Sequence, residues 1–376
     1  MEQLKQVKFI AFFAVFVMLQ NSALAESSVD RSSNSSDRWA LAGFTEADIP
    51  SNKLANYRRL ERVRIEFASD ELLAQLRAKF PDIEFLTADT QSEQQPDAIF
   101  LSCGSPAALT QASQAIWIHS YSAGVEACID HPVFAAQNVK ATLTNSRGTA
   151  ASVIAEHAIA MMMSFARGLH RFRDAQLQAR WSRDMLREGG VTTTVGGKTM
   201  LVLGLGSIGK DVARRANALG MRVLATRNRS RSGPDYVDYV GLADETLKLA
   251  SQADVVVNAL PLTESTKGLL DETFFQAMKP TAMLVSVGRG GTTNTDALLD
   301  ALREKQIAGA ALDVTDPEPL PADHPLWRET NVIITPHLAG SGGEAREKTF
   351  ALAVENLRRY QAGEPLLNMV DPELGY

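Results

Sequence analysis

The sequence predicts an α/β protein with two doubly wound parallel sheets. Short apolar runs typical of buried strands alternate with helical patterns, and this alternation continues through most of the 376 residues. Hydrophobic residues make up 45% of the chain and charged residues 22%, which is ordinary for a globular protein with substantial cores. The net charge of −6 argues against nucleic-acid binding driven by bulk charge.

The first 25 residues have the pattern of a secretory signal peptide. Two lysines precede an apolar run at 9–19, and Ala23-Leu24-Ala25 fits a cleavage site with small residues at its first and last positions. Residues 26–38 are rich in serine and charge, which predicts a disordered spacer. We therefore expect a periplasmic or secreted protein. The alternatives are an uncleaved signal that remains in the membrane and a cytoplasmic protein whose true start lies further downstream.

The first folded region, from about residue 39 to 145, is expected to form one parallel sheet. Ser69 can cap a helix that runs through Lys79, and Pro106 opens another helix. The apolar runs interpreted as strands are 62–67, 83–86, 98–101, 116–121 and 139–144.

A long helical pattern dense in alanine and methionine follows at 149–171. It is apolar around much of its circumference, so we expect it to be buried or to form an oligomer interface. Together with the resemblance described below, this helix favours a homodimer. Residues 180–195 are polar and rich in turn formers, as expected for a connection into the next domain.

A strand, a glycine loop, a helix and a second strand follow one another between residues 199 and 230. The apolar run 200–203 leads into GLGSIG at 204–209, and a helical pattern continues to the second apolar run at 221–226. In this context the glycines allow a tight turn and a close approach to a pyrophosphate, and the helix N-terminus favours an anion. The expected dinucleotide contacts of this Rossmann unit are Gly204, Gly206, Ser207, Ile208 and Gly209.

The end of the second strand indicates which dinucleotide is preferred. NAD enzymes place an acidic residue there, about 20 residues after the glycines, to hold the ribose hydroxyls. Here the position holds Arg227, followed by Asn228, Arg229 and Ser230. Arginine and serine would bind a 2′-phosphate, whereas a carboxylate would repel it. We expect NADP(H) to be preferred, with NAD(H) possible if the basic loop is only solvated.

Three polar residues follow later strands of the same predicted sheet. Arg289, Glu318 and His337 come after its last three strands, and ligands of such sheets bind beyond the carboxyl ends of the strands. Arginine can hold a carboxylate, histidine can transfer a proton, and a nearby glutamate would orient the ring and favour imidazolium. The later strands are interpreted as 253–259, 282–287, 309–314 and 332–335, with helices at 296–305 and 343–359.

The two cysteines and five of the six histidines are expected to be structural. Cys103 and Cys128 lack the spacing of a metal site, and no metal is predicted. Spacing alone does not decide whether they form a disulfide, and two buried thiols are the favoured interpretation. The histidines without a chemical setting are His119, His131, His157, His170 and His324.

Long ordered motifs in this chain resemble those of the D-isomer-specific 2-hydroxyacid dehydrogenases. The resemblance implies a Rossmann nucleotide domain at 146–345 inserted in a flavodoxin-like substrate domain, which comprises 39–145 and 346–376. It extends from about residue 62 to 363 and is strongest from 150 to 340. The motifs are GLGSIG at 204–209, NALPLTESTKGLL at 258–270, VSVGRGGTTNTDALLDAL at 285–302, AALDVTDPEPLPADHPLW at 310–327 and TPHLAG at 335–340.

The resemblance also implies roles for individual residues. Arg289 matches the family's substrate-binding arginine, and His337 matches its catalytic acid/base. Glu318 matches the glutamate that pairs with that histidine. The segment 121–126 resembles the loop whose backbone amides hold the substrate carboxylate, which points to Ser122, Ala123 and Gly124. Asp313 matches the acid that holds the nicotinamide amide. The further implied cofactor contacts are Leu260, Pro261, Thr266, Val287, Gly288 and Gly340.

The implied reaction interconverts a 2-oxo acid and a D-2-hydroxy acid by hydride transfer, with His337 as the acid/base. Glyoxylate and hydroxypyruvate are favoured substrates, but the loop 102–105 carries no charged residue that would select one acid. Formate dehydrogenase is disfavoured because it carries glutamine where Glu318 stands. The alternative is a nucleotide-binding scaffold with little turnover. Export also conflicts with the cofactor, since free NADP(H) is expected to be scarce outside the cytosol.

Overall fold

The computed structural model describes residues 44–87, 90, 95–112, 114–132, 141–181, 183 and 192–371. Every element below belongs to the compact unit formed by residues 43–376. The predicted signal peptide and spacer lie outside the described residues. In the part of the chain that is described, no helix is long and apolar enough to cross a membrane.

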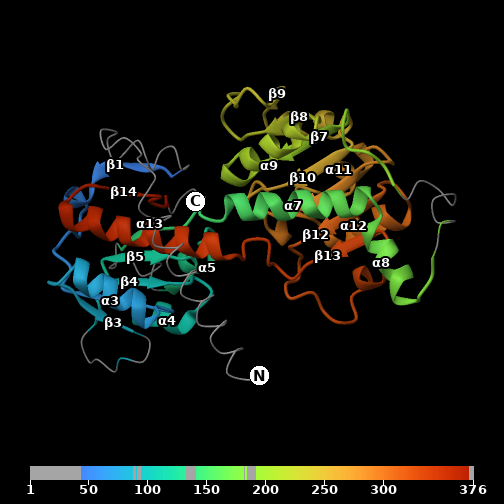
Figure 1. Cartoon of the computed structure of the whole chain (residues 1–376). Helices are drawn as coiled ribbons and strands as arrows, with labels where there is room; N and C mark the ends of the chain where they lie inside the picture. The colour runs from blue at the N-terminus through green and yellow to red at the C-terminus, as the bar shows by residue number, and fades with distance from the viewer. Residues whose placement is uncertain are drawn as a thin grey trace, which may run out of the picture. The chain divides into compact units, whose positions relative to one another are not determined.

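The first sheet has five parallel strands in the order β3-β2-β4-β5-β6, which is the flavodoxin-like arrangement. Helices α3 and α13 cover one face, while α4 and α5 cover the other. Figure 1 shows α13 alongside β4 and β5, although it comes from the far end of the chain. The elements are β2 (Arg62–Ile65), β3 (Glu84–Leu86), β4 (Ala98–Leu101), β5 (Trp117–Ser120), β6 (Thr142–Thr144), α3 (Asp70–Lys79), α4 (Pro106–Gln111), α5 (Glu126–Ile129) and α13 (Gly343–Ala362).

Alternation along the strands explains how this sheet is buried on both faces. Phe100 and Trp117 pack with Leu357 of α13, whereas Ile99 and Ile118 face α4 and α5. The Ser69 hydroxyl caps α3 by accepting from Leu72 N at 3.3 Å, as predicted.

A small antiparallel ribbon, which the sequence analysis did not anticipate, pairs β1 (Glu46–Pro50) with β14 (Pro365–Leu367). The buried Arg359 joins it to α13, because its guanidinium contacts Glu46 at 3.2 Å and Glu355 at 3.0 Å. A buried arginine of this kind needs such paired carboxylates to compensate its lost hydration.

The second sheet has seven parallel strands in the order β13-β12-β11-β10-β7-β8-β9. Counted from β7, this is the Rossmann order with one strand added. Strands β8 and β9 extend the sheet on one side of β7 and the later strands on the other, so the strand order reverses between β7 and β10. Helices α7 and α9 cover one face, and α10, α11 and α12 cover the other. The strands are β7 (Thr199–Leu203), β8 (Arg222–Thr226), β9 (Tyr239–Gly241), β10 (Val255–Asn258), β11 (Met283–Ser286), β12 (Gly309–Leu312) and β13 (Val332–Ile334).

Burial on both faces accounts for the continuous apolar strands of this sheet. Val255 and Val257 belong to the core beneath α7 and α9, while Val256 belongs to the opposite core. The helices are α7 (Ala151–Ala166), α8 (Leu169–Leu177), α9 (Ser207–Ala218), α10 (Thr246–Ala250), α11 (Glu272–Ala277) and α12 (Thr295–Arg303); short 3₁₀ turns are η1 (Ser51–Lys53), η3 (Ala243–Glu245), η4 (Gly290–Thr292) and η5 (Pro325–Arg328).

The prediction of a single helix at 149–171 is wrong in one respect, because the structure has two helices there, α7 and α8. Gly168 lies between them with φ of 63°, a left-handed conformation that ends a helix and that glycine adopts without steric cost. The glycine was visible in the sequence, but the apolar periodicity continues across it.

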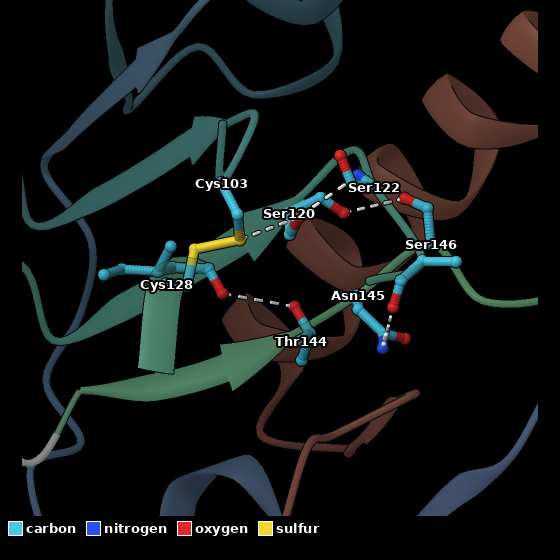
Figure 2. Close-up of a disulfide and its surroundings, with 9 residues drawn as sticks. Cys103, Ser120, Ser122, Cys128, Thr144, Asn145 and Ser146 are labelled. Atoms are coloured by element: carbon cyan, nitrogen blue, oxygen red, sulfur yellow. Dashed lines mark hydrogen bonds between the residues drawn. A yellow bond between two sulfur atoms is a disulfide. The ribbon is translucent and has the colours of Figure 1, made fainter. Parts of the chain in front are cut away.

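The prediction of two free thiols at Cys103 and Cys128 is also wrong. The two sulfurs form a disulfide, and both residues are buried (Figure 2). Cys103 follows β4 and Cys128 lies on α5 just after β5. Because β4 and β5 are neighbours in the sheet, the topology brings together two cysteines that are 25 residues apart in sequence.

His119 is buried in the first sheet, as expected for a structural histidine. Its Nδ1 lies 2.8 Å from Thr144 Oγ1, and its ring packs edge-on against Phe100 and Trp117. Within the described residues, its Nε2 has no hydrogen-bond partner. Burial lowers the pKa of His119 to about 3, so the ring remains neutral in the folded protein.

We predict that this histidine makes stability fall in acid. Below the ordinary pKa of 6.5 and down to about 3, the unfolded chain binds a proton at His119 that the folded chain does not. The free energy of unfolding should therefore fall with decreasing pH, by at most about 1.4 kcal/mol per pH unit for this one group. Urea unfolding of wild type and His119→Phe between pH 7 and pH 4.5 measures the difference. Equal pH slopes for the two proteins would contradict the prediction.

Candidate active site

The glycine loop joins β7 to α9 as the sequence analysis predicted. Gly204 has φ of 88°, and a side chain there would meet the Ala259 carbonyl. A methyl group on Gly209 would collide with the Gly204 carbonyl oxygen, so glycine is needed for α9 to pack against the loop. Open space surrounds the position where Gly206 would carry a side chain. A pyrophosphate can therefore approach the backbone at the N-terminus of α9, which fits a dinucleotide.

The loop after β8 carries the residues expected to choose the cofactor. Arg227 Nη1 donates to the Ser232 carbonyl at 2.9 Å, while Asn228 and Arg229 are exposed. Ser230 Oγ accepts from Ser232 N at 3.1 Å. Ser232, which was not among the predicted cofactor residues, adds a further hydroxyl group to this loop.

Arg231, the next basic residue, serves a different purpose. It pairs with Glu245 at 2.6 Å and donates to the Tyr239 hydroxyl at 2.9 Å. Hydrogen bonds from Tyr239 and from Leu242 N, with Arg231 beside it, lower the pKa of Glu245 to about 2. The charge of Arg231 is thus paired with Glu245, whereas the Arg227 guanidinium contacts a neutral serine, Ser232.

The other predicted cofactor residues follow neighbouring strands of the second sheet. Thr266 Oγ1 donates to the Pro261 carbonyl at 2.7 Å, which fixes the loop after β10. A methyl group on Gly288 would press on the backbone of Leu260, so the loops after β10 and β11 are in close contact. The structure therefore gathers these residues at one edge of the sheet, from Leu260, Pro261 and Thr266 after β10 to Val287 and Gly288 after β11, with Asp313 after β12 and Gly340 after β13.

Asp313 organises the loop that carries His337. Its buried carboxylate accepts from Thr335 Oγ1 at 2.6 Å and from the backbone amides of Leu338 and Ala339 at 3.0 Å each. His337 N also donates to the Asp313 carbonyl at 2.8 Å. Asp313 therefore has a structural task in addition to the cofactor contact implied by the resemblance.

His157, which was predicted to be a structural histidine, contacts residues of the candidate site. Its Nε2 lies 3.0 Å from Thr335 Oγ1 and 3.6 Å from Asp313 Oδ1. It reaches them from α7, which packs against β12. Sequence offered no signal for this contact, because 178 residues separate His157 from Thr335.

His337 and Glu318 meet as the sequence analysis expected. The Nδ1 of His337 lies 2.5 Å from Glu318 Oε1, and both side chains are partly exposed. His337 has φ of 54°, a conformation rare for a side-chain-bearing residue, and it is held there by the bonds of its loop. A glutamate on Nδ1 leaves Nε2 to exchange a proton with a ligand, which is the arrangement of an acid/base pair.

Arg289 lies directly after β11 and contacts the predicted substrate loop. Its Nε is 3.3 Å from Glu126 Oε1, and its Nη1 donates to the Gly288 carbonyl at 3.0 Å. A methyl group on Gly124 would collide with the Arg289 guanidinium. The glycine is therefore required for this arginine to lie against the loop, and Glu126 is a contact that the sequence analysis did not foresee.

The substrate loop itself is fixed by hydrogen bonds from within the first sheet. Ser122 N donates to Ser120 Oγ at 3.1 Å, and Ser146 N donates to the Ser122 carbonyl at 3.2 Å. Asn145 Nδ2 donates to the Ala123 carbonyl at 2.9 Å. Figure 2 shows Ser120, Ser122, Asn145 and Ser146 gathered beside the disulfide. The described residues contain no cluster of acidic, histidine or cysteine side chains that could hold a metal ion.

Comparison with known proteins agrees with this architecture. The model of the D-isomer specific 2-hydroxyacid dehydrogenase NAD binding domain matches residues 159–339. A glyoxylate reductase of Korarchaeum cryptofilum is 35% identical over 239 residues, which are 62% of this chain and 70% of that protein.

Solved structures give the same result. A D-isomer specific 2-hydroxyacid dehydrogenase family protein of Aeromonas salmonicida has a TM-score of 0.71 at 30% identity, over 83% of this chain and 99% of its own. A D-isomer specific 2-hydroxyacid dehydrogenase of Xanthobacter autotrophicus, solved with NADPH and MES, has a TM-score of 0.70 at 27% identity, over 84% and 99% of the two chains.

Two doubly wound sheets, one with a dinucleotide-type glycine loop, define a nucleotide-dependent oxidoreductase. The chain belongs to the D-isomer specific 2-hydroxyacid dehydrogenase family and is an NAD(P)-dependent enzyme of that class. It acts on 2-oxo or 2-hydroxy acids.

Proposed function

We propose that this enzyme reduces a small 2-oxo acid to the D-2-hydroxy acid with NADP(H), using His337 as the proton donor. The His337–Glu318 pair supports the proposal, because an imidazole with a carboxylate on its Nδ1 lies at the carboxyl edge of the nucleotide sheet. A nicotinamide bound at the glycine loop would supply the hydride.

The protein's own residues perform the remaining tasks. Arg289 holds the substrate carboxylate and carbonyl oxygen through its guanidinium, and the loop at Ser122 to Gly124 offers backbone amides to the carboxylate. Protonated His337 donates to the carbonyl oxygen as negative charge develops on it, while Arg289 stabilises that charge. Glu318 keeps the imidazole oriented through Nδ1. Oxidation of the hydroxy acid uses the same groups in the opposite sense.

Assays of NADPH and NADH oxidation with glyoxylate, hydroxypyruvate, pyruvate and bulkier 2-oxo acids test the proposal. We expect turnover with NADPH and a small acid, since a glyoxylate reductase is among the relatives and the loop 102–105 carries no charged side chain. NADPH binding without turnover on any acid would instead favour the nucleotide-binding scaffold.

The preference for NADP(H) should depend on Arg227. Among the described residues its guanidinium donates only to Ser232, which lies beside Ser230, so it can turn to a 2′-phosphate without breaking an ion pair. Arg227→Ala should raise the KM for NADPH about 10- to 100-fold, the value of a charge-assisted contact, and leave the KM for NADH unchanged.

Arg222→Ala is the matched control, because Arg222 is exposed at the opposite end of the same strand. It should leave both constants unchanged. A wild-type enzyme that turns over faster with NADH than with NADPH would contradict the proposed preference.

We further propose that the enzyme is a homodimer. Leu169 and Leu177 of α8 and Trp181 just beyond it are 55%, 69% and 92% exposed, which is unusual for large apolar side chains. They continue from the alanine- and methionine-rich α7, and a second copy of this chain would cover them. Sedimentation should give twice the chain mass for wild type, and Trp181→Glu should weaken the association. A monomeric wild type would contradict the proposal.

An oxidising compartment is proposed as the place of action. The N-terminal pattern supports export, and the disulfide is typical of proteins outside the reducing cytosol. Fractionation of cells followed by N-terminal sequencing should find a chain that begins near Glu26 outside the cytosol. An intact Met1 in the cytosolic fraction would contradict this.

A further inference from the structure

The Cys103–Cys128 disulfide lies next to Ser120, which in turn contacts Ser122 of the substrate loop (Figure 2). Cys103 belongs to the loop after β4, and Cys128 is the third residue of α5, which begins where the substrate loop ends. The bond therefore connects two segments that follow neighbouring strands, β4 and β5. Neither cysteine takes part in the proposed reaction.

One line of contacts leads from the disulfide to the backbone of the substrate loop. The buried Ser120 hydroxyl lies 3.3 Å from Cys103 Sγ and accepts from Ser122 N at 3.1 Å. Since a disulfide sulfur carries no proton, Ser120 donates to it, and both hydrogen-bonding roles of the hydroxyl are used. The position of Cys103 thus determines the orientation of Ser120, which in turn holds the amide of Ser122.

A second line of contacts leads to Arg289. Cys128 and Glu126 lie on the same turn of α5, and Glu126 contacts Arg289 Nε at 3.3 Å. The helix has only four residues and no side-chain cap, so it has little intrinsic stability. The disulfide is the covalent link that holds this turn against the sheet. Its loss would allow Glu126, and with it Arg289, to shift relative to Gly124.

We propose that Cys103 and Cys128 are positioning residues whose redox state sets the affinity of the enzyme for the carboxylate of its substrate. The oxidised form holds the substrate loop and Arg289 in register, and the reduced form binds the carboxylate more weakly. This inference rests on the proposed function in assigning the loop and Arg289 to the substrate. Reduction by a dithiol breaks the sulfur–sulfur bond and gives two protein thiols, while the reductant loses two hydrogens and becomes a cyclic disulfide.

The test compares oxidised and dithiothreitol-reduced enzyme in complex with NADPH, using oxamate as an analogue of a 2-oxo acid. Calorimetric titration should show oxamate binding roughly tenfold more weakly after reduction, the cost of misplacing binding groups by a fraction of an ångström to an ångström. The affinity for NADPH should not change, because the glycine loop lies on the other sheet. Amide hydrogen exchange in residues 120–129 should accelerate on reduction.

Two variants make the result independent of reductant effects. Cys103→Ala/Cys128→Ala should bind oxamate as weakly as the reduced enzyme and should not respond to dithiothreitol. Ser120→Ala retains the disulfide but loses the hydroxyl that contacts Cys103 and Ser122, and it should also weaken oxamate binding. If the reduced protein unfolds, this variant tests the inference in its place. In steady-state turnover, both variants should raise the KM for the 2-oxo acid by a larger factor than they lower kcat.

Equal oxamate affinity in the oxidised, reduced and Ser120→Ala proteins would overturn the inference, and so would an oxidised protein that does not bind oxamate. Failure of the proposed function has a different signature. In that case no 2-oxo acid would cause NADPH oxidation, while the redox-dependent oxamate affinity would remain.

Discussion

Replacing His337 with alanine is expected to lower kcat for 2-oxo acid reduction by about 10²- to 10⁴-fold, the usual contribution of a positioned general acid. No other histidine can substitute within the described part of the site. His157, the nearest alternative, is already engaged with Thr335 and Asp313. The measurement is steady-state oxidation of NADPH, with NADPH affinity determined separately by fluorescence titration.

Glu318→Gln is the matched variant, because glutamine can still contact Nδ1 but carries no charge. Its kcat should fall between those of wild type and His337→Ala, since Glu318 contacts Nδ1 at 2.5 Å and orients the ring, and glutamine would keep only part of that contact. Both variants should bind NADPH like wild type. Full activity of His337→Ala would show that another group donates the proton.

Arg289→Ala is expected to reduce kcat/KM for the 2-oxo acid by about 10³-fold, because a bidentate charge-assisted contact and the stabilisation of the developing oxyanion are lost together. The KM should rise and kcat should fall, as the arginine contacts the substrate before and during the reaction. The effect on NADPH binding should be small. Kinetics across a range of acid concentrations separate the two constants.

Arg289→Lys provides the control for charge alone. Lysine retains the positive charge but lacks the planar fork, so it should recover only part of the lost kcat/KM. The Glu126 contact at 3.3 Å provides a second comparison, because Glu126→Gln leaves the guanidinium in place but weakens the ion pair that orients it. Unchanged kcat/KM in Arg289→Ala would remove this residue from the site.

Much of the fold could be predicted because both sheets are parallel and buried. Strands such as Ala98–Leu101 and Val255–Asn258 are continuous apolar runs, and this burial is encoded locally. The short β9 (Tyr239–Gly241) and the ribbon of β1 with β14 could not be found in this way. Three to five residues with exposed positions carry too little periodicity to be distinguished from loops.

The site could be predicted where a residue follows directly from a strand. Arg289 and His337 each come three residues after a strand of the same parallel sheet, so topology alone gathers them at one edge. The contacts of Arg289 with Glu126 and of Asp313 with His157 join segments more than 150 residues apart. They depend on tertiary packing, and no local pattern indicates them. The Cys103–Cys128 bond escaped prediction for the same reason, because it requires the adjacency of β4 and β5.

The most direct test of the proposed reaction follows the hydrogen itself. The enzyme is incubated with glyoxylate, hydroxypyruvate or pyruvate and with NADPH that carries deuterium in both positions at C4 of the nicotinamide. The product is analysed by mass spectrometry and chiral chromatography. We predict one deuterium at C2 of a hydroxy acid and, for the chiral products, the D configuration. A folded enzyme that binds NADPH but forms no deuterated hydroxy acid from any of these acids would contradict the proposal.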